Sequence, residues 1–416
     1  MSIDYEPMSS KNWRDPYPVY RQLRDEAPLH QAPGSGTWCL SRHADVVAAL
    51  RQPEIFSSVA MEKILMIGSS RLGARDLPAL LRFAFRARVN PFRNPGPPPG
   101  LINSDPPFHD ALRDVVNRGF TPRRIAAWEP RMREIAQERI QGLRGGGPFD
   151  VVRDLAIPLP VTVIAEILGV EAERQHDFKR WSDSIVSFTS GTTRGGGMAG
   201  ILDPMGECRN YVRGVVRARR EQPADDLISL LVDPAREDTL DEAEVFGLII
   251  LLLVAGNETT TNLIGNTTLA LLEHPETLER VAAAPSLVPA LVEETLRWDS
   301  PVQLIFRETT REVELPSGKI PAGASVALLL GAANRDERVF EAGERFDIDR
   351  NPAGHVGFGF GVHFCLGASL ARLEALVALE TLIPELPHRR ASEAQPPLVD
   401  SFLVRGPSRL QLVAAH

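Results

Sequence analysis

The sequence predicts a mainly α-helical protein with a small β region. Apolar residues recur at helical spacing through most of the chain from about residue 108 to about residue 300. The segment 240–273 is apolar on nearly every face in its middle, which is typical of a helix that passes through a protein core. Strand-like residues return at 301–330 and at 402–413. Together these patterns favour helices over a sheet-dominated fold.

The N-terminal part, about 1–56, mixes short helical patterns with strand-like pieces such as TWCL at 37–40. Residues 57–107 form an irregular stretch that ends in ARVNPFRNPGPPPG, which contains too much proline and glycine for regular structure. Within it, LPALLRFAFRARV has apolar residues at helical spacing. We interpret this stretch as a long loop that carries one short lid helix.

The region 108–300 is the predicted helical core. Its helical segments include FHDALRDVVNRGF, RIAAWEPRMREIAQERIQGL and PVTVIAEILGV. The long central helix begins with Asp241, Glu242 and Glu244, and acidic side chains stabilise a helix N-terminus. No repeat or linker separates this core from 301–416, so we expect one domain over 1–416.

Composition and charge restrict the function and the location of the chain. A formal net charge of −8 argues against general nucleic-acid binding, which needs a basic surface. The three cysteines, Cys39, Cys208 and Cys365, are too few and too scattered for a disulfide framework or a zinc site. The N-terminus has no apolar signal-peptide region, and the apolar run 245–256 is shorter than a membrane span. We therefore expect a cytoplasmic protein.

The segment GFGFGVHFCLGASLAR, at 357–372, carries the strongest chemical signal. Gly359 and Gly361 allow positive backbone φ angles, and Cys365 stands where a helix is expected to begin. Backbone N–H groups and the positive end of a helix dipole lower the pKa of a thiol in such a position. A lone cysteine is more often a small buried apolar residue, so the loop by itself leaves both interpretations open.

The ten residues FGFGVHFCLG resemble the haem-binding pattern F-x-x-G-x-x-x-C-x-G of the cytochrome P450 superfamily. The resemblance implies that Cys365 binds the haem iron and that Phe358 packs near its sulfur. It further implies that Gly359 belongs to the haem-binding loop, that Gly367 lets the following helix lie against the porphyrin, and that His363 bonds a propionate. The implied fold is the triangular haem-monooxygenase prism.

Other family motifs follow in the expected order. Glu294 and Arg297 lie three residues apart on one helix face and resemble the structural E-x-x-R pair. The resemblance implies that this pair binds the segments 334–336 and 346–347. His109 and Arg113, four apart on one helix face, and Arg307 resemble the positions that hold the haem propionates. Each of these residues, taken alone, is more typical of an ordinary surface position.

The long helix contains AGNETTT at 255–261, which resembles the family's oxygen-binding pattern A-G-x-(D/E)-T. Gly256 would open the helix groove beside the iron, Thr259 would donate a hydrogen bond during O–O cleavage, and Glu258 would supply protons through water. A run of threonines in a helix otherwise indicates a local kink or a surface feature.

The resemblance covers nearly the whole chain and implies a haem b monooxygenase that uses O2 to hydroxylate or epoxidise a mostly apolar organic substrate. It also implies a monomer that takes electrons from a ferredoxin or flavodoxin with its NAD(P)H reductase, without binding a membrane. A peroxide-dependent peroxygenase, a haem-based sensor or ligand-binding protein, and a structural helical protein without haem remain alternatives.

Two sets of residues are predicted to contact partners. The substrate pocket is expected to be lined by residues of the lid helix, the long helix and two later segments: Phe83, Phe85, Leu252, Ala255, Val302, Leu304, Ile305, Phe402 and Leu403. Arg118, Arg123 and Arg124 are the candidates for docking an acidic redox protein. Arg82 either reaches inward, which would favour a carboxylate-bearing substrate, or lies on a basic surface helix together with Arg86.

Overall fold

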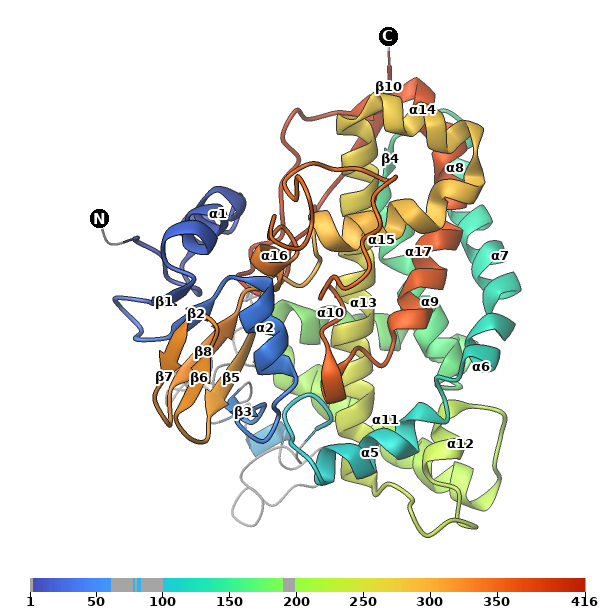
Figure 1. Cartoon of the computed structure of the whole chain (residues 1–416). Coiled ribbons are helices and arrows are strands. Elements are labelled where there is room, and N and C mark those ends of the chain that lie inside the picture. Colours follow the sequence, from blue (N-terminus) through green and yellow to red (C-terminus); the bar gives the residue numbers. More distant parts are fainter. Residues whose placement is uncertain (1–2, 61–77, 79–80, 84–99, 190–198, 416) are drawn as a thin grey trace. The chain divides into compact units, whose positions relative to one another are not determined.

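The structure, a computed structural model, describes residues 3–60, 78, 81–83, 100–189 and 199–415 (Figure 1). The chain divides into two compact units. The sheet-bearing unit comprises Met1–Ala60, Ile125–Pro160 and Thr259–His416. The helical unit comprises Met61–Arg124 and Val161–Glu258.

The main sheet of the sheet-bearing unit has five strands in the order β1-β2-β8-β5-β3. Strands β2 and β8 are parallel, and the other neighbours are antiparallel. The short β-branched and apolar segments of β2 and β8 lie opposite each other, and they bury Leu40, Val326 and Leu328 in one core cluster. The strand bounds are β1 (Leu29–Gln31), β2 (Trp38–Leu40), β3 (Phe56–Ser57), β5 (Ile305–Thr309) and β8 (Ser325–Leu328).

Two smaller sheets complete the β structure of this unit. Strands β4 (Phe149–Asp150), β10 (Gln411–Ala414) and β9 (Arg389–Ala391) pair in that order, and β6 (Val313–Leu315) forms a hairpin with β7 (Gly318–Ile320). The strand expected over 402–413 is therefore shorter than predicted. Pro407 has no backbone N–H to donate, and the chain before β10 makes isolated bridges such as Val302 with Val404.

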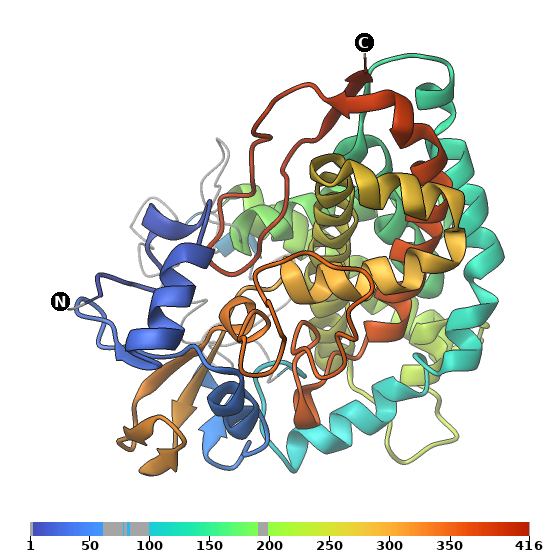
Figure 2. The same cartoon turned by 45° about the horizontal axis from the view of Figure 1, so that its top comes forward.

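Helix α17 is central to the helices of the sheet-bearing unit and packs against both α7 and α15 (Figure 2). The helix predicted over 124–143 is divided into three pieces, with breaks at Trp128 and Ile140. The first break fits Pro130, which has no N–H to donate and therefore lies in the first turn of α7. The bounds are α1 (Tyr17–Glu26), α2 (His43–Leu50), α7 (Glu129–Arg139), α8 (Gln141–Arg144), α14 (Pro275–Ala283), α15 (Val288–Trp298), α16 (Leu330–Ala333) and α17 (Ala368–Leu382). Helices α6 (Pro122–Ala127) and α9 (Pro158–Ile167) have residues in both units, and most of α9 belongs to the helical unit. Short 3-10 and π turns are η1 (Ser10–Asn12), η3 (Val151–Ala156), η5 (Pro285–Leu287), η6 (Gly361–His363) and η7 (Ile383–His388).

The helical unit is formed mainly by α5 (Phe108–Asn117), α10 (Gln175–Thr189), α11 (Ala199–Glu221) and α12 (Leu227–Leu231), with the short turn η4 (Ala172–Arg174). Helix α11 packs against α10 and α12. Of the predicted lid helix, Leu81, Arg82 and Phe83 are helical, whereas Leu80, Phe85 and Arg86 lie outside the described residues. The Arg82 side chain is half exposed and lies 3.6 Å from Asp203, which supports the surface alternative for this arginine.

Helix α13 (Glu242–Glu273) runs through both units. Its predicted acidic start is a reciprocal cap, in which Glu244 N–H donates to Asp241 Oδ1 and Asp241 N–H donates to Glu244 Oε2, both at 2.8 Å. Among the described residues it is the one helix long and apolar enough to cross a membrane. Buried polar residues such as Asn266, which donates to Asp299 O and Arg405 O, indicate instead a helix in the protein core.

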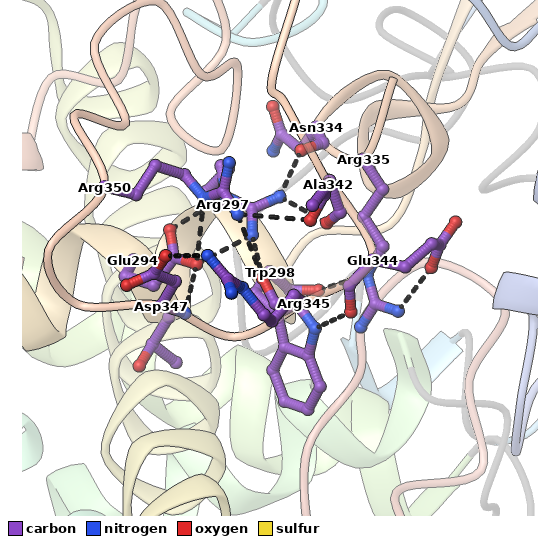
Figure 3. A network of polar contacts seen from close by, with 12 residues as sticks. Glu294, Arg297, Trp298, Asn334, Arg335, Ala342, Glu344, Arg345, Asp347 and Arg350 are labelled. Carbon is purple, nitrogen blue, oxygen red and sulfur yellow. Dashed lines mark hydrogen bonds and ion pairs between the residues drawn. The ribbon is translucent and has the colours of Figure 1, made fainter. Parts of the chain in front are cut away.

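The fully buried Arg297 guanidinium is the centre of a polar network (Figure 3). It forms a two-pronged ion pair with Glu294, at 2.7 Å and 2.8 Å, and donates to the carbonyl oxygens of Asn334, Gly343 and Arg345. All five of its N–H donors are therefore bonded. Glu294 also accepts from the N–H of Asp347 at 2.8 Å, so α15 is tied to the segment 334–347.

A second cation stabilises the neighbouring part of this region. The Arg335 guanidinium lies 3.2 Å from the ring centroid of Tyr17 and 4.7 Å from that of Trp298, and it pairs with Glu344 at 3.0 Å. Trp298 Nε1 in turn donates to Glu344 O. Arg335 therefore connects α1 to α15 through cation–π contacts.

Replacing Arg297 with Met is expected to lower the free energy of unfolding by about 3–5 kcal/mol, because Glu294 then remains buried and charged after losing its two-pronged ion pair, with only the more distant Arg350 guanidinium beside it. Urea denaturation followed by circular dichroism measures this loss. Arg280→Met is the matched control, since Arg280 forms an exposed ion pair with Asp349, and that variant should unfold like the wild type. Equal behaviour of the two variants would contradict the importance given to the Arg297 network.

Candidate active site

The loop before α17 holds Cys365 in a backbone conformation that glycine makes possible. Gly359 and Gly361 have φ angles of 72° and 71°, and a Cβ atom at Gly361 would lie 2.5 Å from Leu50 O. Cys365 N–H donates to Phe358 O at 2.9 Å, which closes the loop. Helix α17 begins at Ala368 with Gly367 as its cap, so Cys365 lies just ahead of the helix rather than within it.

Cys365 differs from the other two cysteines in its exposure. Cys39 and Cys208 are both fully buried, and burial raises the pKa of each thiol, for Cys208 to about 12. Cys365 is partly exposed, together with the neighbouring Phe364, whose side chain is 40% exposed. Cys365 is therefore the cysteine of the three that is not fully buried.

Two further candidate haem-binding residues, His363 and Arg307, lie in the same unit as Cys365. His363 Nε2 is 2.8 Å from Ser58 Oγ. Ser58 directly follows strand β3, and the sequence patterns did not indicate this contact. Arg307, on β5, is 5% exposed, and its Nη1 donates to Phe306 O. In the described part of the chain, a Cβ at Gly367 would meet no atom within 4 Å other than those of its chain neighbours.

The middle of α13 has one face that is less buried than the rest. Leu251, Val254, Glu258 and Thr259 are partly exposed and Ala255 is exposed, at the three- and four-residue spacing of a single helix face. Space is open beside Gly256, where an added Cβ would meet no atom within 4 Å. Burial raises the pKa of Glu258 to about 7, so this carboxyl can hold a proton near neutral pH.

His109 and Arg113 lie on α5 in the helical unit. His109 is fully buried, with its Nδ1 2.9 Å from Asp110 Oδ1, and Arg113 is partly buried one turn further along the helix. The spacing of four residues places both side chains on the same helix face, as predicted from the sequence.

The two later pocket segments lie side by side in the sheet-bearing unit. Val302 bridges Val404, and Gln303 N–H donates to Leu403 O at 2.8 Å. The Phe402 ring packs against Trp13 and Phe306, with centroids 6.2 Å and 6.1 Å apart. The other predicted lining residues differ in exposure: Leu304 and Leu252 are buried, whereas Ile305 and Phe83 are partly exposed.

A model of the family described as cytochrome P450 matches residues 285–414. The vitamin D(3) 25-hydroxylase of Pseudonocardia autotrophica is 39% identical over 413 residues, which cover 98% of this chain and 95% of that protein. The chain belongs to the cytochrome P450 family. Cyclomarin C epoxidase CymV of Salinispora arenicola is 35% identical over 399 residues, which cover 95% of each chain. Cytochrome P450 CYP109Q5 from Chondromyces apiculatus, a solved structure, is similar with a TM-score of 0.86 and 38% identity over 100% of this chain and 99% of that one.

These similarities confirm the predicted family and fold class, a mainly helical cytochrome P450 with a small β region. The family uses haem and O2, and its bacterial members hydroxylate or epoxidise organic substrates with electrons from redox partners. The chain is therefore a cytochrome P450 monooxygenase, an oxidoreductase.

The sequence patterns did not reveal every polar residue near the site of this cytochrome P450. Glu374, on α17, is 2% exposed, and burial raises its pKa to about 8, although a hydrogen bond from Thr260 lowers it. Arg350 Nε lies 3.4 Å from Glu294 Oε1 and extends the Arg297 network. A charged residue inside an apolar helical stretch, as in ARLEALVAL, was the available signal for Glu374.

We expect Glu258 to make this cytochrome P450 less stable as the pH rises from about 5 to about 8. The pKa of Glu258 is higher in the folded chain than in the unfolded chain, so the folded state binds the proton more strongly and loses that advantage as the proton dissociates. Urea denaturation over this range should give a smaller pH slope for Glu258→Gln than for the wild type. The exposed Glu276 is the matched control, and Glu276→Gln should keep the wild-type slope.

Proposed function

We propose that this cytochrome P450 binds haem b through the thiolate of Cys365 and inserts one oxygen atom from O2 into a mostly apolar organic substrate. The observation that carries the proposal is the exposure of Cys365 at the end of a glycine-stabilised loop, while Cys39 and Cys208 are fully buried. Haem is a flat apolar macrocycle with two carboxylates, so a thiolate site for it needs a sulfur ligand for the iron, apolar contacts for the ring and cations for the carboxylates. The loop itself contains the sulfur of Cys365, the aromatic rings of Phe358 and Phe364, and the imidazole of His363.

Each haem-binding residue would supply one of these interactions. Cys365 would hold the iron, Phe358 would pack beside the sulfur, and Gly359 and Gly367 would let the backbone approach the ring. His109, Arg113, Arg307 and His363 would bind the propionates. When bound, haem supplies O2 binding and O–O cleavage, and a thiolate ligand favours the cleavage by donating electron density to the iron.

Proton delivery is assigned to Glu258 and Thr259. The Glu258 carboxyl carries a proton near neutral pH because burial raises its pKa to about 7. Thr259, the next residue, shares the partly exposed face of α13 and can direct the proton through its hydroxyl. The peroxygenase alternative does not need this acid and alcohol pair.

The substrate would lie against the partly exposed face of α13 and the paired segments 302–305 and 402–403. Relatives named as a vitamin D(3) hydroxylase and a cyclomarin C epoxidase act on different molecules, so family membership supports an apolar substrate class and leaves the compound open. Among the described residues no cysteine forms a disulfide, which fits a reducing compartment, and we propose that the chain acts in the cytoplasm as a monomer.

Electrons would come from a ferredoxin or flavodoxin, itself reduced by an NAD(P)H reductase. Of the three candidate docking arginines, Arg118 pairs with Asp238 and Arg124 lies 3.6 Å from Asp225. Arg123 is exposed, and within the described part of the chain it has no ion pair. Its charge is therefore available to an acidic partner, which makes Arg123 the strongest of the three candidates.

Cys365→Ala should abolish the strongly red-shifted carbon monoxide band of the reduced enzyme and all oxygenase activity, because no other side chain would supply a thiolate. The carbon monoxide difference spectrum of purified protein measures the band. Cys208→Ala is the matched control and should keep it, since that thiol is fully buried. A red-shifted band in Cys365→Ala would refute the ligand assignment.

Thr259→Ala should bind haem and substrate normally but form much less product for each reductant consumed, with hydrogen peroxide released in its place. Glu258→Gln should slow turnover by roughly 100-fold, the usual cost of losing a general acid. Product, peroxide and reductant are measured in the same reaction. Full coupling in Thr259→Ala would mean that the threonine serves helix packing alone, or that a substrate hydroxyl replaces it.

Arg123→Glu should slow reduction by an acidic ferredoxin strongly at low salt and little at high salt, because mobile ions screen charge steering. Stopped-flow reduction at two ionic strengths measures the effect. Arg124→Glu should have a smaller effect, since that arginine already lies beside Asp225. Equal slowing by Arg123→Glu at both ionic strengths would remove the electrostatic explanation.

A further inference from the structure

A second polar cluster lies behind the Cys365 loop, separate from the Arg297 network. Glu293, on α15, accepts from Arg372 on α17 through two contacts, Nε to Oε1 at 2.5 Å and Nη2 to Oε2 at 3.0 Å. His355 Nε2 is 3.1 Å from Glu293 Oε2. Glu293 therefore joins two helices and the start of the loop.

The hydrogen bonds of His355 assign the position of its proton. Gly357 N–H donates to His355 Nδ1 at 3.1 Å, so a neutral imidazole carries its proton on Nε2 and donates it to Glu293. Gly357 itself has little space, because a Cβ there would lie 2.7 Å from Leu296 O. The backbone immediately before Phe358 is therefore held against α15.

Arg372 extends the cluster to Phe358. Its guanidinium lies 4.5 Å from the centroid of the Phe358 ring, at cation–π distance. Phe358 O in turn accepts the N–H of Cys365. A continuous path of contacts thus leads from Glu293 through Arg372 and Phe358 to the residue that carries the sulfur.

The charges of this cluster are partly shielded from water. The side chain of His355 is 6% exposed, that of Glu293 29% and that of Arg372 37%. Burial alone would raise the pKa of Glu293, but the hydrogen bonds from His355 and Arg372 outweigh it and lower the pKa to about 2. Glu293 is thus an anion and Arg372 a cation at neutral pH.

Resting on the haem–thiolate function proposed above, we propose that Glu293, His355 and Arg372 are positioning residues that set the reduction potential of the iron bound to Cys365. They hold Phe358 against the loop and place one positive and one negative charge behind it. A nearby cation favours the addition of an electron, and a nearby anion disfavours it. The two charges therefore affect the potential in opposite directions.

The test is a spectroelectrochemical titration of the full-length, haem-loaded protein. Arg372→Met should lower the midpoint potential, since the anion of Glu293 remains without its partner. Glu293→Gln should raise it, because the cation of Arg372 is no longer compensated. Arg372→Lys keeps the charge and should lie closer to the wild type than Arg372→Met. Arg280→Met, far along the chain in an exposed pair, should leave the potential unchanged.

A merely structural role predicts a different result. If the cluster only stabilised the fold, Arg372→Met and Glu293→Gln would both lower the unfolding midpoint without shifting the midpoint potential in opposite directions. A potential that stays constant in both variants, or that moves in the same direction in both, would overturn the inference. If Arg372→Met loses haem, Glu293→Gln carries the test, and a midpoint potential that does not rise in that variant would overturn the inference. A wild-type protein without the red-shifted carbon monoxide band would instead refute the haem–thiolate function itself.

Discussion

The buried charge of Arg297 is the interaction on which the region around Cys365 depends. A guanidinium inside a protein is tolerated when all its donors are bonded, and here the backbone oxygens of three residues between 334 and 345 complete the set. The same segment then reaches the loop through Asn334, whose side-chain oxygen accepts Val356 N–H at 2.7 Å and whose amide donates to Ser300 Oγ. Because the buried Arg297 charge needs these backbone oxygens as hydrogen-bond partners, it restricts the conformation of the chain that leads to Cys365.

The long helix α13 shows how similar residues in one run acquire different roles. Thr261 donates to Ala156 O of the π turn η3, and Thr267 and Thr268 donate to carbonyl oxygens four residues earlier. Thr260 is buried and bonds Glu374. These hydroxyls are used in packing, whereas Thr259 lies on the partly exposed face. Helical periodicity therefore separates the candidate catalytic threonine from its neighbours.

Local patterns predicted the helices, the family and the residues of the Cys365 loop, because short-range chemistry determines these features. The acidic cap at Asp241 and the positive φ angles at Gly359 and Gly361 are examples. Contacts between distant segments were harder to predict. Nothing near Ser58 in the sequence indicates His363, and nothing near Arg372 indicates Glu293, since these pairs arise from packing of separate elements. The helix predicted over 124–143 was wrong in length partly because the preference of Pro130 for the first turn of a helix was not considered.

The different burial of the three cysteines also affects how the chain responds to oxidation before it binds its cofactor. Burial raises the pKa of the Cys39 and Cys208 thiols, so almost none of either is present as thiolate at neutral pH. Both residues are therefore poor targets for peroxides and alkylating agents. Cys365 is the accessible sulfur of the three. Oxidative damage would therefore fall first on the residue that we propose as the iron ligand, and a damaged chain that stays folded would be unable to mature into the proposed enzyme.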